Sequence, residues 1–233
     1  MRPRTLDHVA LWVADRDSIA DFVTVHCGMH VVEQTDKFTL VGSDARHGKL
    51  TLFVADGPRE RGALKHVALR VSDLRAAIGE LPERLAVEQP RDGEAYFDVH
   101  EGVRLGLVEA NTRVEYDLDH VALFSTDPAA TARAYERLGF RYAPPGPSGQ
   151  PRLEVGGAYV ELYDGEPGDP ERPLLNHLAV LVDSTDEHIS EAEELGVEID
   201  DIVDAPNTYA VFLRGPERVR IEYVEHKASF SLT

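Results

Sequence analysis

Leu6-Asp7-His8-Val9-Ala10-Leu11 returns letter for letter as Leu118-Asp119-His120-Val121-Ala122-Leu123. Looser copies follow each of them: Lys-His-Val-Ala-Leu at residues 65–69 and Asn-His-Leu-Ala-Val at residues 176–180. Their histidines, His66 and His177, lie 58 and 57 residues after His8 and His120. The spacing indicates four similar modules in tandem, each with a histidine at the same point.

The local pattern of each module predicts a strand, a helix and three further strands. In the third module, alternation places His120, Ala122 and Phe124 on one face and Val121 and Leu123 on the other, which is typical of a buried strand. Asp127 then precedes Pro128, a pairing that favours a helix start, and Gly139 ends the helical run. Short β-like runs separated by turn residues complete the module, as they do at residues 31–33, 38–41 and 50–54 in the first.

We therefore expect an α+β fold of four tandem βαβββ modules paired into two domains, each a curved mixed sheet enclosing a cleft. Turn-rich linkers at residues 110–116 and 165–173 place the expected boundaries. The N-terminal domain would span residues 1–112 with repeats 5–58 and 63–110, and would lack metal. The C-terminal domain would span 113–233, with repeats 117–165 and 173–226 and the metal site.

Composition narrows the possible partners. The 233 residues carry a formal net charge of −18, which disfavours nucleic acid and membrane surfaces as partners because both are anionic. No stretch has the length and apolarity of a signal peptide or a membrane span, so we expect a cytoplasmic protein. A single cysteine, Cys27, excludes an internal disulfide.

The ends of the two halves differ at one position that bears on chemistry. Glu222 in the C-terminal half aligns with Gly106 in the N-terminal half, and its even spacing from Arg220 and Val224 places it on their face of a strand. Together with His120 and His177 it would supply two imidazoles and a carboxylate, a set suited to Fe(II), Mn(II) or a similar ion. His8 and His66 have no evident third ligand, so we expect them to be packed core residues.

Glu161 is a further candidate ligand. When Gly48 is aligned with Gly157, Leu52 stands at the position of Glu161. A carboxylate that replaces leucine on a packed strand is costly unless it is exposed, paired or bound to metal. A metal ligand and a solvated edge position both remain open. We expect the six other histidines at the surface, although His226 shares the parity of Glu222.

These tandem modules, opening on His-Val-Ala-Leu and closing on a strand with a glutamate, resemble the vicinal oxygen chelate superfamily. That superfamily includes glyoxalase I, bleomycin-resistance proteins and type I extradiol dioxygenases. The four-module architecture is most similar to the extradiol dioxygenases, which cleave catechol rings. The resemblance implies that His120, His177 and Glu222 hold one divalent ion, Fe(II) first, with Mn(II), Ni(II), Co(II) or Zn(II) as alternatives.

The resemblance also implies a small-molecule substrate of aromatic type. Exposed strands at the edges of open sheets favour a homodimer. The sequence departs from the dioxygenases at their acid–base residues, because Phe212 stands at the tyrosine position and residues 203–205 lack the histidine. Tyr209 is the nearest substitute as a catalytic group, with a packed strand aromatic as the alternative.

Two other functions stay open. The set His120, Glu161, His177 and Glu222 is similar to the ligands of glyoxalase I, in which the metal polarises a carbonyl and a carboxylate ligand can act as the base. That chemistry would make the chain an isomerase or lyase and would need no added histidine or tyrosine. A metal-free protein that binds a small ligand would also account for the missing dioxygenase residues.

Overall fold

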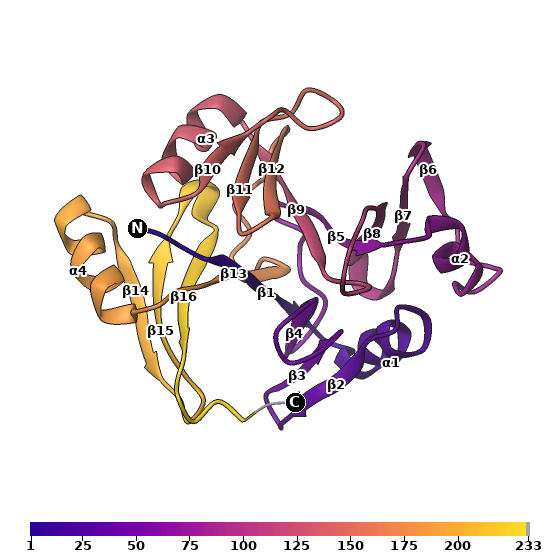
Figure 1. The fold of residues 1–233 in the computed structure, drawn as a ribbon, viewed down its shortest axis with the longest axis horizontal. Helices are drawn as coiled ribbons and strands as arrows, with labels where there is room; N and C mark the ends of the chain where they lie inside the picture. The colour runs from indigo at the N-terminus through magenta and orange to yellow at the C-terminus, as the bar shows by residue number, and fades with distance from the viewer. Residues whose placement is uncertain (232–233) are drawn as a thin grey trace.

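The computed structural model describes residues 1–231, and within that range the βαβββ order occurs four times (Figure 1). Modules 1 and 2 comprise β1 (Thr5–Val13), α1 (Arg16–His26), β2 (His30–Gln34), β3 (Phe38–Gly42), β4 (Lys49–Val54), β5 (Leu64–Val71), α2 (Leu74–Gly79), β6 (Glu88–Arg91), β7 (Glu94–Asp98) and β8 (Arg104–Glu109). Modules 3 and 4 comprise β9 (Leu118–Ser125), α3 (Pro128–Arg137), β10 (Arg141–Ala143), β11 (Arg152–Val155), β12 (Ala158–Asp164), β13 (Leu175–Leu181), α4 (Thr185–Leu195), β14 (Ile199–Asp204), β15 (Thr208–Arg214) and β16 (Arg220–His226). The expected α+β class and its modules are confirmed.

Each helix begins after a side chain that caps it. Asp15, Asp73, Asp127 and Ser184 each accept a hydrogen bond from the backbone N–H three residues ahead. This bond satisfies one of the donors that a helix start leaves free. Within the described range, no helix has both the length and the apolar character needed to cross a membrane.

The strands form two eight-stranded sheets. One has the order β14-β15-β16-β13-β1-β4-β3-β2 and combines modules 1 and 4, so we call it the outer-module sheet. The other has the order β10-β11-β12-β9-β5-β8-β7-β6 and combines modules 2 and 3, and we call it the inner-module sheet. The two sheets have the same strand arrangement, with the first strands of two modules paired at the centre.

This pairing differs from the expected one, in which residues 1–112 and 113–233 would each form a domain of consecutive modules. Strand β1 pairs antiparallel with β13, and β5 pairs antiparallel with β9. Residues 55–63 carry the chain from the outer-module sheet to the inner one. The first strands of the four modules have very similar sequences. Their hydrophobic pattern therefore predicts that two first strands pair with each other, without indicating which two.

Strand alternation divides each sheet into a core face and an open face. Val9 and Leu11 belong to a hydrophobic core that both sheets share. The helices help to close this core between the sheets: the Tyr223 hydroxyl of β16 donates to the backbone oxygen of Leu138, at the end of α3, over 2.7 Å. His8 and Ala10 have the opposite parity to Val9 and Leu11, so the histidines lie on the face turned away from the core.

Two short 3₁₀ turns also connect the sheets. The turn at His100–Gly102 places the carboxylate of Glu101 on the backbone N–H groups of Ala14 and Asp15, at 2.8 and 2.5 Å, where α1 begins. The turn at Pro216–Arg218 places Glu217 on the Ser125 and Thr131 hydroxyls beside α3. Each sheet thereby contacts a helix that belongs to the other.

Candidate metal centre

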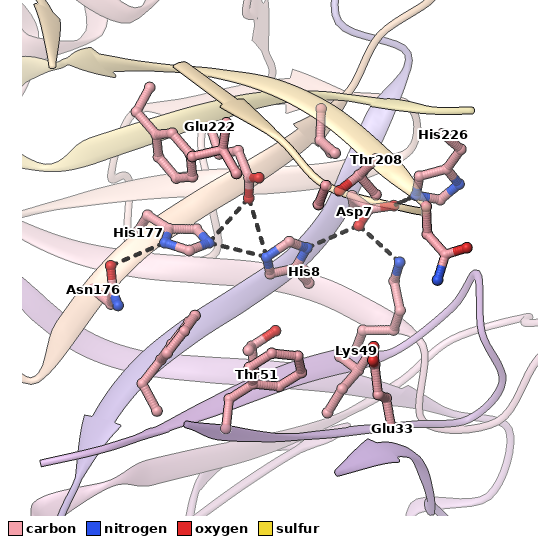
Figure 2. Close-up of a pocket in the computed structure, with 18 of the residues that line it drawn as sticks. Asp7, His8, Glu33, Lys49, Thr51, Asn176, His177, Thr208, Glu222 and His226 are labelled. Atoms are coloured by element: carbon pink, nitrogen blue, oxygen red, sulfur yellow. Dashed lines mark hydrogen bonds and ion pairs between the residues drawn. The ribbon is translucent and has the colours of Figure 1, made fainter. Parts of the chain in front are cut away.

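Three side chains from adjacent strands of the outer-module sheet converge on one point (Figure 2). They are His8 of β1, His177 of β13 and Glu222 of β16. The two Nε2 atoms lie 3.0 Å apart, and the Glu222 Oε2 atom lies 3.0 Å from His177 Nε2 and 3.2 Å from His8 Nε2. His177 and Glu222 are buried, and His8 is nearly so.

Strand register explains why these three side chains meet. His177 pairs with Ala10 across β1 and β13, which places it diagonally opposite His8 on the same face. Glu222 pairs with Ala179 across β13 and β16, two residues beyond His177. Because side chains two residues apart share a face, all three point to the open side of the sheet.

The proton arrangement of the cluster favours a cation at its centre. His8 Nδ1 lies 2.8 Å from a carboxylate oxygen of Asp7, and His177 Nδ1 lies 3.0 Å from the Asn176 side-chain oxygen, so each Nδ1 is assigned as the donor. Neutral imidazoles protonated there direct both Nε2 lone pairs at the centre. Glu222 Oε2 also points there, and it is buried without a well-aligned hydrogen bond. Three acceptors that face one another fit a bound metal ion.

When no metal is bound, a proton on His8 occupies the centre of the cluster. Burial alone would lower the pKa of His8, but hydrogen bonds to Asp7 and Glu222 outweigh burial and raise the pKa to about 9. Burial lowers the pKa of His177. Burial would raise the pKa of Glu222, yet the neighbouring imidazoles hold it well below its usual range. The cluster therefore combines a protonated His8, a neutral His177 and an ionised Glu222.

A cavity of about 570 Å³ opens onto this cluster. Its walls include Trp12, Phe38 and Phe53 from module 1 and Phe212 from module 4, while Thr51 lies beside the ligands. Such a cavity, mostly apolar with a few convergent polar groups, is typical of a small-molecule site.

The structure does not bring His120 to His177 and Glu222. His120 lies on β9 of the inner-module sheet, where its Nε2 faces His66 Nε2 at 2.9 Å and the Glu161 Oε2 atom at 3.7 Å. The four residues proposed for a glyoxalase-type set are thus divided between two sheets. The sequence prediction assumed that consecutive modules share a cleft, and the β1–β13 pairing gives His177 and Glu222 the partner His8 instead.

In the inner-module cluster the carboxylate already has a cationic partner from the protein. His66 Nδ1 has no hydrogen-bond partner, so His66 can carry its proton on Nε2 and donate it to His120. Glu161 is buried, 2.8 Å from Arg152 Nε through one oxygen, and its other oxygen accepts from the Gln150 amide at 2.6 Å and the Tyr163 hydroxyl at 3.0 Å. The carboxylate is already paired with a guanidinium and two hydrogen-bond donors.

Register also corrects the comparison between Glu161 and Leu52. Glu161 pairs with Ala122 as Thr51 pairs with Ala10, so Thr51 is the equivalent position. The alignment of Gly48 with Gly157 was one residue out, because Lys49, the residue after Gly48, is equivalent to Tyr159, which lies two residues after Gly157. A shift of one residue moves a side chain to the other face.

Gly106 is the equivalent of Glu222, since it pairs with Ala68 as Glu222 pairs with Ala179. A Cβ atom at Gly106 would lie 2.6 Å from the ring of Tyr96. The aromatic ring fills the space that the carboxylate occupies in the outer-module sheet. The inner-module cleft therefore excludes a second glutamate by packing.

The structure places the proposed catalytic Tyr209 outside the cavity. Its hydroxyl donates to Asp186 of α4 over 3.1 Å, on the face opposite to the cluster. Thr208 and Phe212, which have the other parity on β15, line the cavity instead. The prediction was wrong because it did not apply to β15 the alternation that it applied to Glu222.

Sequence reasoning missed several residues of this site. His8 carries the same motif as His120, and only the strand pairing shows that it has a third ligand. Asp7, Lys49 and His226 also line the cavity, although His226 was expected at the surface. The parity that His226 shares with Glu222 was the one signal that pointed to it.

The sequence-family model of the Glyoxalase/Bleomycin resistance protein/Dioxygenase superfamily matches residues 5–88 and 117–223. The chain belongs to this superfamily. No curated protein sequence matches it.

Two solved structures have similar folds. A protein of Bacillus subtilis described as a "putative dioxygenase" superposes with a TM-score of 0.81 at 15% identity, over 98% of this chain and 87% of that one. Glyoxalase I from Zea mays superposes with a TM-score of 0.72 at 17% identity, over 95% and 92%. At these identities the likeness shows the fold alone.

Proposed function

We propose that the chain is a divalent-metal-dependent enzyme of ring cleavage, acting on a catechol-type substrate, with His8, His177 and Glu222 as the metal ligands. The observation that carries the proposal is the convergence of three acceptor atoms from three strands on one buried point beside a cavity. Two imidazoles and one carboxylate suit Fe(II), Mn(II), Ni(II), Co(II) or Zn(II), and Fe(II) is the choice for an oxygenase.

The number of ligands favours ring cleavage over a glyoxalase-type reaction. In the outer-module sheet Thr51 stands where a fourth ligand would be, and Glu161 lies in the other sheet. A metal held by three protein ligands keeps open positions for two substrate oxygens and dioxygen. The structure thus supports the ligand count of a facial triad rather than that of a His₂Glu₂ site.

The cavity walls favour an aromatic substrate. The rings of Trp12, Phe53 and Phe212 offer flat apolar surfaces beside the ligands, and aromatic pairs contribute about 0.5–1.5 kcal/mol beyond the burial of their area. The chain would hold the ring of the substrate between these side chains. Its two adjacent oxygens would then face the ion that His8, His177 and Glu222 would hold.

Metal analysis of matched variants tests the ligands. Glu222→Ala is expected to lower metal content and affinity by more than the roughly 10–100-fold typical of residues that only support a ligand. Glu161→Ala removes an equally buried glutamate from the inner-module sheet and is the control. Equal metal binding by wild type and Glu222→Ala would contradict the proposed site.

Oxygen consumption tests the reaction. The Fe(II)-loaded protein is expected to take up oxygen with a member of a panel of catechols, and Glu222→Ala is expected to lose that uptake. A loaded protein that consumes no oxygen with any catechol would contradict ring cleavage. A metal-dependent isomerase or lyase would then be the assignment, and a protein that binds no metal would be assigned as a small-ligand binder.

A further inference from the structure

Asp7, the residue before the proposed ligand His8, is buried and contacts side chains on three strands (Figure 2). Its Oδ2 atom lies 2.8 Å from His8 Nδ1 and 2.7 Å from Lys49 Nζ, and its Oδ1 atom lies 3.2 Å from His226 Nε2. We propose that Asp7 and Lys49 are positioning residues for the metal ligand His8: Lys49 fixes the Asp7 carboxylate, and Asp7 fixes the imidazole. This inference rests on the metal site proposed above.

The contact between Asp7 and His8 determines which nitrogen faces the metal. A carboxylate at Nδ1 holds the proton there and leaves the lone pair on Nε2. It also fixes the rotation of the ring, so that Nε2 points toward His177 Nε2 and Glu222 Oε2. Partners of this kind are typical of histidines that bind metals in proteins.

Both oxygens of Asp7 are held in place. Lys49 approaches from β4, directly opposite His8 in the parallel β1–β4 register. His226 approaches from the end of β16, where its ring stacks on Phe230 with centroids 4.1 Å apart. Contacts from two strands restrain the carboxylate more strongly than either contact would alone.

Comparison of the two sheets separates this role from a general requirement of the fold. In the inner-module sheet Asp119 lies 2.8 Å from His120 Nδ1, as Asp7 does from His8. Its cation, however, is Arg70 of β5 at 3.0 Å, and Tyr159 stands at the position of Lys49. The aspartate–histidine pair is common to both sheets, but the buried lysine belongs to the sheet with the metal cluster.

A buried lysine in this place has an energetic cost that a purely structural residue would avoid. Lys49 is 3% exposed and lines the cavity, and Asp7 is its ion-pair partner. Desolvation of such a pair often cancels its Coulombic gain, and well-packed apolar residues of similar volume are frequently as stable. The Lys49–Asp7 pair is therefore better explained by the orientation that it gives to His8 than by stability.

Cobalt binding to the full-length protein tests the role of Asp7. Co(II) alone is the probe, followed by calorimetric titration and by its visible absorption, which reports the ligand geometry. Asp7→Asn is expected to weaken Co(II) binding about 10–100-fold and to change the spectrum. Asp119→Asn, which removes the same negative charge beside the equivalent histidine of the other sheet, is expected to bind Co(II) like wild type. Equal affinities of Asp7→Asn and wild type would overturn the proposal.

Lysine variants test the other half of the network, also where Asp7→Asn fails to fold. Lys49→Met leaves Asp7 without its cation and is expected to weaken Co(II) binding, whereas Lys49→Arg keeps the charge and should restore most of the affinity. The double variant Asp7→Asn/Lys49→Met is expected to bind no more weakly than Asp7→Asn alone, because both residues act through one contact. Additive losses, or a Lys49→Met variant with wild-type affinity, would contradict the assignment of Lys49.

The same experiments test the proposed metal site separately from the positioning roles of Asp7 and Lys49. If wild type binds no Co(II), or binds it with the same affinity when Glu222 is replaced, the metal site itself is wrong. If Glu222→Ala abolishes binding while Asp7→Asn and Lys49→Met leave affinity and spectrum unchanged, the metal site stands and the positioning roles are rejected.

Discussion

His8 and His120 show how neighbouring side chains give two identical motifs different properties. Each imidazole lies 2.8 Å from an aspartate through Nδ1, and each faces a second histidine through Nε2, at 3.0 and 2.9 Å. The carboxylate beside them differs: Glu222 points only at the two imidazoles, whereas Glu161 is held by Arg152. A carboxylate free of other partners is what makes the first cluster suitable for a metal.

Histidine replacements should show the same asymmetry. His8→Ala removes one of three ligands and is expected to lower metal affinity by more than about 100-fold, beyond the usual effect of a supporting residue. His120→Ala removes the equivalent histidine, which is more deeply buried, from the other sheet and should leave metal affinity unchanged. Calorimetric titration with Fe(II) or Mn(II) under anaerobic conditions measures both, and loss of binding in the His120 variant would favour the site first expected from the sequence.

The charge of His8 predicts a pH dependence of stability in the metal-free protein. Its pKa is about 9 in the folded state, against about 6.5 for an unperturbed histidine. Because the folded-state pKa is the higher, the stabilisation is fully present below about pH 6.5 and is lost as the pH rises through 9. The difference corresponds to roughly 3 kcal/mol.

Urea unfolding with a chelator, at pH 6 and at pH 9.5, measures this effect. The fall in unfolding free energy across the interval is expected to be smaller in His8→Gln than in wild type. Identical pH dependences in the two proteins would exclude His8 as the titrating group.

Some of the site follows from the sequence alone, and the rest depends on long-range contacts. The parity of Glu222 with Val224, together with the histidine at the start of each module, placed His177 and Glu222 on strand faces that do meet. His8 could not be chosen over His120, because their local sequences are identical. Lys49 was not recognised because its importance comes from β4 lying next to β1.

At the scale of the strand, the register of β4 against β1 assigns Thr51 to the place of a fourth ligand. Thr51→Glu is expected to tighten metal binding, because a fourth anionic donor joins the three present, and to reduce oxygen uptake, because it takes a position otherwise open. Val54→Glu is the control, since it adds the same charge to β4 at an exposed position of the opposite parity. Unchanged metal affinity in Thr51→Glu would mean that this position does not reach the ion.

The elements themselves were largely predictable. Capping residues, alternation and turn glycines placed four helices and their flanking strands in the right order, since these features act over a few residues. The Thr51 register was not, because it depends on the position of the turn glycine relative to the strand, which differs by one residue between Gly48 and Gly157. The turn before a strand sets the register of that strand, and with it the face on which each side chain lies. The composition of the turn does not reveal this register.

For the whole molecule, the pairing of module 1 with module 4 predicts how fragments behave. Residues 1–112 contain His8, and residues 113–233 contain His177 and Glu222, so neither half holds all three proposed ligands. Each half produced alone is expected to lack Co(II) binding, and mixing the two halves is expected to restore it if they reassemble. A fragment of residues 113–233 that binds Co(II) like the full chain would contradict the sheet pairing.

Which modules share a sheet could not be predicted from the repeat itself. Four similar modules offer similar central strands, and the linker of residues 55–63 is compatible with staying in one sheet or crossing to the other. The expected homodimer stays a prediction, to be checked by light scattering. The edge strands β14 and β2 of the outer-module sheet and β10 and β6 of the inner one are where subunits would pair.

The sheet pairing also determines the order in which the two sheets can form during synthesis. Strands β5 and β9 are close in the chain, so the inner-module sheet can form while the last module is still being made. Strand β1 has β4 beside it early, but its second neighbour arrives late, because 169 residues separate His8 from His177. At about 5–20 residues per second the ribosome needs roughly 10 to 30 s to supply it. During that interval one edge of β1 has no partner strand, and the proposed metal site stays incomplete until Glu222 has been made.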